Sequence, residues 1–202
     1  MLLQLFAALM LQADMAHAAE APIANGLFLV AKPALLDPNF RETVVLVTQP
    51  IPGGGTLGVI LNRPLAARLS ELFPEAAGAL PHFDPLYAGG PVARNQLLFL
   101  VRSQEPPSTA LRVLDDVVLS GDRELLAKIV SGRMKVNAFR AYAGFAGWAA
   151  RQLQVEIAQG GWYVIPADAD TIFSADAATL WAELIKRINA RSARRNAELC
   201  YA

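Results

Sequence analysis

The stretch TVVLVTQPIPGGGTLGVILNRP, residues 43–64, decides the fold. Its two runs of branched apolar residues, 43–49 and 56–62, are typical of buried β-strands. The prolines and the glycines 53–55 between these runs can hold neither a helix nor a ladder of hydrogen bonds. The stretch therefore predicts two strands joined by a tight connection.

The same three glycines raise the alternative of a nucleotide-binding loop. A phosphate-binding loop places its glycines between a strand and a helix and adds a Lys-Ser/Thr pair that reaches the phosphate. Here Thr56 follows the glycines, no lysine is near, and the next segment has the pattern of a strand. The dinucleotide pattern fails for the same reason. A hairpin is the favoured interpretation.

Outward from the hairpin, short apolar segments alternate with amphipathic ones. Two long helices are predicted, one over 120–132 between Asp122 and Gly132 and one over 148–161. Ser174 is expected to cap a last helix that buries Leu180, Trp181, Leu184, Ile185 and Ile188. Further strands are predicted over 27–33, 85–92, 96–103, 135–144 and 162–168. With no repeat and no linker, the pattern indicates one α+β domain over 19–202.

The composition indicates a folded protein rather than a basic nucleic-acid-binding one. Of the 202 residues 54% are apolar and 18% charged, and the formal net charge is zero. A basic tail, 186–202, concentrates Lys186, Arg187, Arg191, Arg194 and Arg195 without an intervening acid. These cations suit the negative end of a helix dipole, and a contact with nucleic acid or anionic lipid is the alternative.

Residues for familiar catalytic or metal chemistry are scarce. The chain has two histidines, His17 and His82, and a single cysteine, Cys200, so a histidine or cysteine metal site is not expected. The carboxylates Asp168, Asp170 and Asp176 lack the spacing of a calcium loop and are expected to serve as turns and caps. We therefore expect no metal and no cofactor.

One row of side chains has two interpretations. On a helix over 148–161, Trp148, Gln152 and Glu156 would be spaced i, i+4, i+8 and form one row. A tryptophan beside an amide and a carboxylate can hold a ligand by stacking and hydrogen bonding. A tryptophan that seals the edge of the core is the alternative.

Five blocks of the sequence resemble the AlgH/YqgE family of bacterial proteins over nearly all of residues 26–188. In order, the blocks are KPALLDPNF, LGVILNRP, YAGGPV, YAGFAGWAARQLQVEI and WYVIPAD followed by IF. The resemblance implies an α+β fold with a bifurcated, partly barrel-like β-sheet flanked by helices. Here Phe145 stands where the family has tyrosine, and 149–151 replaces a glycine-rich segment, so this part is expected to be more helical.

The resemblance implies little about activity, although some members are described as transcriptional regulators. The shared blocks are poor in acid/base pairs, which favours a non-enzymatic binding or regulatory protein with an unknown small-molecule or protein partner. Strand ends are where polar groups and close backbone approach meet ligands, which selects Asn62, Arg63, Gly89 and Gly90 beside Trp148 and Gln152. A hydrolase with Asp37 or Glu156 as general base is one alternative. Weak, non-specific DNA binding through the basic tail is another.

The N-terminus suggests export. An apolar run over 2–11 is too short to span a bilayer, which takes about 20 residues, and it precedes the small residues Ala16 and Ala18. This pattern predicts a signal peptide over 1–18, a mature chain without a transmembrane segment and a periplasmic location. Two alternatives stay open: an added helix, or translation from Met15, which would leave the protein cytoplasmic.

The intact mass of the protein from its native host distinguishes these possibilities. Signal peptidase prefers small residues at the positions that 16 and 18 would occupy, so we expect a chain that begins at Ala19. A chain that begins at Met15 would indicate a misplaced start. A chain that retains Met1 would contradict both.

Overall fold

The hairpin at 43–64 forms as expected. In the computed structural model, which describes residues 26–51, 55–73, 85–108 and 110–200, β2 (Val44–Ile51) pairs antiparallel with β3 (Gly55–Ile60). Their register runs from Val45 opposite Ile60 to Ile51 opposite Gly55, so a strand and not a helix follows the glycines. Glycines 53 and 54, the segment 1–18 predicted to be a signal peptide, and His82 lie outside the described residues.

The other elements surround this hairpin in one ten-stranded sheet. The other strands are β1 (Leu27–Ala31), β4 (Pro64–Arg68), β5 (Pro85–Ala88), β6 (Val92–Arg102), β7 (Leu111–Leu114), β8 (Val117–Ser120), β9 (Ala138–Trp148) and β10 (Trp162–Pro166). The helices are α2 (Leu69–Leu72), α3 (Arg123–Val130), α4 (Gln152–Ala158), α5 (Ala169–Ser174) and α6 (Leu180–Cys200). The sheet curls into a half-barrel, so the predicted α+β fold is confirmed.

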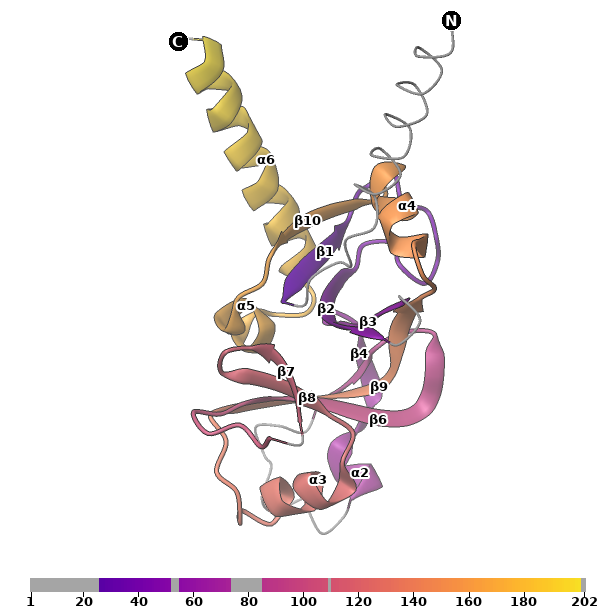
Figure 1. Cartoon of the computed structure of the whole chain (residues 1–202), viewed down its shortest axis with the longest axis vertical. Helices are drawn as coiled ribbons and strands as arrows, with labels where there is room; N and C mark the ends of the chain where they lie inside the picture. Colours follow the sequence, from indigo (N-terminus) through magenta and orange to yellow (C-terminus); the bar gives the residue numbers. More distant parts are fainter. Residues whose placement is uncertain (1–25, 52–54, 74–84, 109, 201–202) are drawn as a thin grey trace, which may run out of the picture.

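β9 is the strand on which the sheet divides. One edge of β9 pairs with β6 over 138–143, and the opposite edge pairs with two strands in succession. That second edge pairs in parallel with β5 at 141–143 and antiparallel with β3 at 146–148. β3 and β5 therefore diverge along one edge of β9, and we call this point the fork. Figure 1 shows β9 running between the upper and lower parts of the sheet.

Glycine is required where the chain passes from β5 to β6 beside β9. A Cβ at Gly89 would overlap the carbonyl oxygen of Gly144, and one at Gly90 would overlap the carbonyl of Phe145. The Gly89 backbone also donates to Ala143 O (2.9 Å), and its carbonyl accepts from Ile60 N (2.8 Å). The two glycines therefore let three backbone segments approach one another at the fork.

Both faces of the sheet are buried at β1, β2 and β3, which explains the continuous apolar runs in their sequence. In β1, Phe28 and Val30 point into the core inside the curl, whereas Leu29 and Ala31 join a second core outside it. α6 closes the inner core with Leu180, Leu184 and Ile188, as its apolar spacing predicts. α3 covers a third core on the lower strands.

The predicted caps are partly right. Asp122 caps α3 by accepting from Glu124 N (2.8 Å), as predicted. Ser174 does not cap the last helix, because it is the final residue of α5. Asp176 holds the start of α6 instead, with its side chain accepting from Ala178 N (3.0 Å). Asp168 acts locally as the cap of α5, whereas Asp170 instead forms a long-range ion pair with Arg102 (2.7 Å).

The helix predicted over 148–161 begins later than expected. Residues 138–148 form one strand, and Trp148 pairs with Thr56. The helix starts only at Gln152, after Arg151 adopts a left-handed conformation (φ 65°). The expectation that Trp148 shares a helix with Gln152 and Glu156 is wrong, because residues 146–148 pair with β3.

α6 extends beyond the sheet with a basic surface. Its last buried contact is Ile188, and the helix continues away from the body to residue 200 (Figure 1). Lys186, Arg187, Arg191 and Arg194 are exposed on it. Within the described residues, no helix is both long and apolar enough to cross a membrane.

We expect Gly89→Ala to lower the free energy of unfolding by about 3 kcal/mol or more, because a Cβ there overlaps a backbone carbonyl that cannot move without disrupting β9. Urea unfolding of the full chain measures the change. Gly147→Ala is the matched control on β9, since its Cβ would lie 3.4 Å from the nearest atom, a side-chain carbon of Phe145. Equal stability of the two variants would contradict this account of the fork.

Candidate functional site

A hollow of about 400 Å³ lies at the fork. Its walls come from the end of β3, the start of β4, the end of β5, β9, and the turn into β6. The lining residues are Asn39, Ile60, Arg63, Pro64, Leu65, Ala88, Gly90, Pro91, Arg94 and Ala143. Among the described residues that line this fork pocket, two are arginines and none carries a carboxylate, so the pocket suits a negatively charged group.

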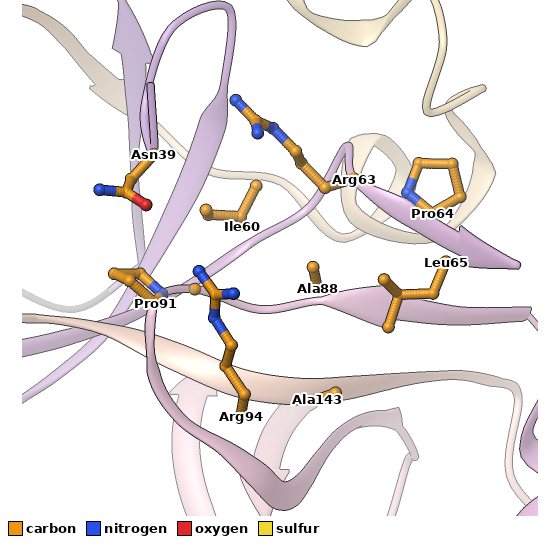
Figure 2. A pocket seen from close by; sticks show the side chains of 10 residues that line it. Asn39, Ile60, Arg63, Pro64, Leu65, Ala88, Pro91, Arg94 and Ala143 are labelled. Carbon is orange, nitrogen blue, oxygen red and sulfur yellow. The ribbon is translucent and has the colours of Figure 1, made fainter. Parts of the chain in front are cut away.

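The fork pocket has a polar end and an apolar end. Figure 2 shows the guanidinium groups of Arg63 and Arg94 on the side toward Asn39, where Ile60 and Pro91 also lie. Ala88 and Leu65 lie on the other side, which has no polar side chain among those drawn. The polar groups come from three separate segments of chain, so only the folded protein brings them together. The arrangement fits a ligand with an anionic head and an apolar body.

Arg63 was predicted to bind a ligand and does line the pocket, but one nitrogen of its guanidinium forms hydrogen bonds within the protein. Its Nη2 donates to the carbonyl oxygens of Arg41 (2.9 Å) and Pro38 (3.4 Å). These bonds fasten the loop before β2 to the end of β3. The other guanidinium nitrogens make no hydrogen bond within the described residues and remain available to a ligand.

Asn62, the second residue predicted to bind a ligand, uses both polar atoms of its side chain to hold the loop before β2. Its Oδ1 accepts from Val44 N (2.8 Å), and its Nδ2 donates to the carbonyl of Glu42 (2.9 Å). Glu42 adopts a left-handed conformation (φ 57°) at this point. Asn62 also borders a second hollow, of about 420 Å³, that lies between this loop and α6. It does not line the fork pocket.

Arg94 was not predicted from the sequence. The register of β6 against β9 shifts between Val92 and Leu97, and Arg94 stands on this irregular stretch. Ala93 before it has a positive φ of 46°, which is costly for a residue with a Cβ. Arg94 is exposed, and no partner for it exists in the described part of the chain. Neither its position on a bulge nor the strain at Ala93 has a signal in the sequence.

The predicted glycines have different roles at the fork. Gly90 lines the pocket, while Gly89 is buried in the contact between β5, β9 and β3. Both glycines were predicted to allow a ligand to approach the backbone closely. In the structure they chiefly allow the backbone of β9 to do so.

Trp148, Gln152 and Glu156 do meet, although not along one helix. The indole nitrogens of Trp148 (3.1 Å) and Trp162 (3.0 Å) both donate to Glu156 Oε2. Gln152 Nε2 donates to Oε1 of the same carboxylate (3.1 Å). Phe40 stacks on Trp148 with ring centroids 5.5 Å apart. This aromatic cluster seals the outer core, which agrees with the alternative given for Trp148.

The two candidate general bases are occupied. Glu156 accepts three hydrogen bonds within the aromatic cluster, and Asp37 Oδ1 accepts from Asn39 N (2.7 Å) in an exposed turn. Neither residue lines the fork pocket. Among the described residues, no group of three histidine, cysteine, aspartate or glutamate side chains is placed to hold a metal ion.

A buried cation lies behind the pocket. Arg140 of β9 is 8% exposed, donates to the carbonyl oxygens of Ala175 (2.8 Å) and Leu61 (3.5 Å), and lies over the ring of Tyr87. Burial raises the pKa of the neighbouring Tyr142 well above its usual range, and the charge of Arg140 opposes this shift only in part. Tyr142 therefore stays a neutral core residue. Neither residue lines the pocket.

We expect Glu156→Gln to cost about 1–3 kcal/mol of stability. The amide keeps the size of the side chain but has one acceptor oxygen, so its NH₂ must face either the two indoles or the NH₂ of Gln152. Thermal and urea unfolding of the full chain measure the loss. Glu105→Gln, at an exposed position, is the control and should change little. An unchanged stability of Glu156→Gln would show that the carboxylate is not a structural acceptor.

Comparisons with known proteins agree on one family. The AlgH-like family model matches residues 28–193. A UPF0301 protein of Thermobifida fusca is 37% identical over 172 residues, which cover 81% of this chain and 86% of that protein. A UPF0301 protein of Chlorobium luteolum is 33% identical over 165 residues, with 81% and 85% covered.

Two solved structures are similar over most of the chain. Protein DIP2367 from Corynebacterium diphtheriae superposes with a TM-score of 0.70 at 25% identity, covering 83% of this chain and 88% of that one. The solution structure of the AlgH protein from Pseudomonas aeruginosa gives a TM-score of 0.63 at 30% identity, with 84% and 87% covered. None of these names states a molecular activity. The resemblance seen in the five sequence blocks is confirmed, and the chain belongs to the AlgH-like family.

Proposed function

We propose that this protein is a non-enzymatic binding protein whose ligand is an amphipathic anion held in the fork pocket. The observation that carries the proposal is the pair of arginines, Arg63 and Arg94, at one end of a pocket whose other end is apolar. The described lining residues include no acid. A desolvated, charge-assisted hydrogen bond between a guanidinium and an anion contributes about 1.5–3 kcal/mol.

Binding is favoured over hydrolysis because the pocket lacks the groups that a hydrolase needs. The described residues of its lining include no carboxylate, histidine, serine or cysteine that could act as base or nucleophile. The two carboxylates considered for such a role lie outside it and are hydrogen-bonded elsewhere.

Nucleic-acid binding through the basic tail ranks second. The exposure of Lys186, Arg187, Arg191 and Arg194 on α6 supports weak, salt-sensitive binding of any polyanion. The periplasmic location predicted from the N-terminus would exclude promoters as targets, and it remains a proposal.

The ligand class is tested with hexanoate, hexyl phosphate and hexanol by isothermal titration to the full chain. We expect the two anions to bind and the alcohol not to bind, because only an anion satisfies the guanidinium groups. Arg94→Gln should weaken anion binding about tenfold or more, which corresponds to about 1.4 kcal/mol. Arg94 has no partner within the described residues, so this variant should fold normally.

Arg123→Gln is the matched control, since Arg123 is exposed on α3 and does not line the pocket. Equal anion affinity in Arg94→Gln and Arg123→Gln would place the site elsewhere. Equal affinity for hexanol and hexanoate would contradict the proposal that the pocket recognises the negative charge of its ligand.

A further inference from the structure

We propose that the fork pocket binds the C-terminal carboxylate of an extended peptide, and that this peptide pairs along the free edge of β4. The inference rests on the proposed function and names its ligand class. Three observations support it: β4 begins at the pocket, the polar end of the pocket is positively charged, and the other described walls are apolar.

β4 is an edge strand. Among the described strands it pairs with β5 alone, through Pro64 opposite Tyr87 and Arg68 opposite Pro85. All five of its residues are exposed. An edge of this kind presents backbone N–H and C=O groups that a second extended chain can pair with.

β4 leads directly out of the fork pocket. Arg63 precedes the strand at the polar end of the pocket, and Pro64 and Leu65 are both strand residues and wall residues. Figure 2 shows the strand leaving the pocket in the direction away from Asn39. A peptide that lies beside β4 therefore reaches the pocket with one of its ends, whereas an edge strand remote from the pocket, such as β7, offers no such continuity.

The charge at the polar end selects which end of the peptide enters. A peptide C-terminus is a carboxylate, whose two oxygens match the planar donors of guanidinium groups. Arg94 contributes an exposed guanidinium without a partner in the described part of the chain, and Arg63 retains donors beyond those used on the loop. A peptide whose C-terminus lies at the start of β4 runs antiparallel to it.

The remaining walls favour a peptide over other anions. Ile60, Leu65 and Pro91 give an apolar surface that a free phosphate would leave unused, and about 400 Å³ accommodates the last one or two side chains. No aromatic side chain stands among the described lining residues, so these offer a nucleotide base no ring to stack on. An apolar last residue is therefore expected.

The experiment uses the immobilised full chain and a pool of eight-residue peptides with a free C-terminus and random residues at the last three positions. Captured peptides are identified by mass spectrometry, and one is resynthesised with a free and with an amidated C-terminus. We expect amidation and Arg94→Gln each to weaken binding at least tenfold, while Arg123→Gln leaves it unchanged. The bound peptide should slow amide hydrogen exchange within 65–67 at least tenfold.

A pair of variants tests the edge itself. Ala66→Pro removes a backbone donor from β4 and should weaken peptide binding while leaving hexanoate binding within twofold. Ala66→Val keeps the donor and should bind like the wild type. Because β4 is exposed at this position, circular dichroism should show both variants folded.

The possible failures separate the two proposals. Capture of no peptide by a protein that binds hexanoate through Arg94 would overturn the peptide inference and leave the proposed function standing. Equal binding of the amidated peptide, or unchanged exchange within 65–67, would also overturn the inference. Binding of neither peptide nor hexanoate would overturn both.

Discussion

The close backbone contact of Gly89 and Gly90 with β9 is the constraint on which the rest of the structure depends. β9 needs partners on both edges, and on one edge it needs two of them, β5 and β3. The chain can pass from β5 to β6 beside β9 only where side chains are absent on the passing segment. Gly144 on β9 supplies the complementary backbone freedom with a φ of 73°. The pocket is a consequence, because two strands that diverge from one edge leave space between their ends.

How much of this was predictable differs between the fold and the site. Branched apolar runs bounded by glycine and proline located seven of the strands, because strands buried on both faces need such runs. The short strands β4, β7 and β8 were not predicted. Trp148, Gln152 and Glu156 were correctly predicted to lie close together, but they do not share one helix as predicted. The spacing fits a continuous helix. It fits equally a strand that ends at Trp148 and is followed by a left-handed Arg151 and a helix, because either backbone brings the three side chains together.

For the site residues, too, the sequence predicted the position of a side chain better than its contacts. A strand end was expected to present Asn62 and Arg63 to a ligand, and the position is right, yet Asn62 uses both ends of its amide to hold the loop before β2. Arg94 escaped prediction because its placement follows from a bulge and from the positive φ of Ala93. Such a conformation is set by the neighbouring strands and not by the local sequence. The Gly-Gly-Pro turn followed closely by an arginine was the one available signal.

Arg63 links the pocket to the loop that precedes β2. Its Nη2 donates to the carbonyl oxygens of Pro38 and Arg41, and Arg63 also lines the pocket, as does Asn39 of the same loop. An anion that binds Arg63 and Asn39 therefore contacts both sides of this junction. Because a ligand that binds only the folded state stabilises it by mass action, occupancy should stabilise the loop together with the pocket. The loop also borders α6 through the second hollow.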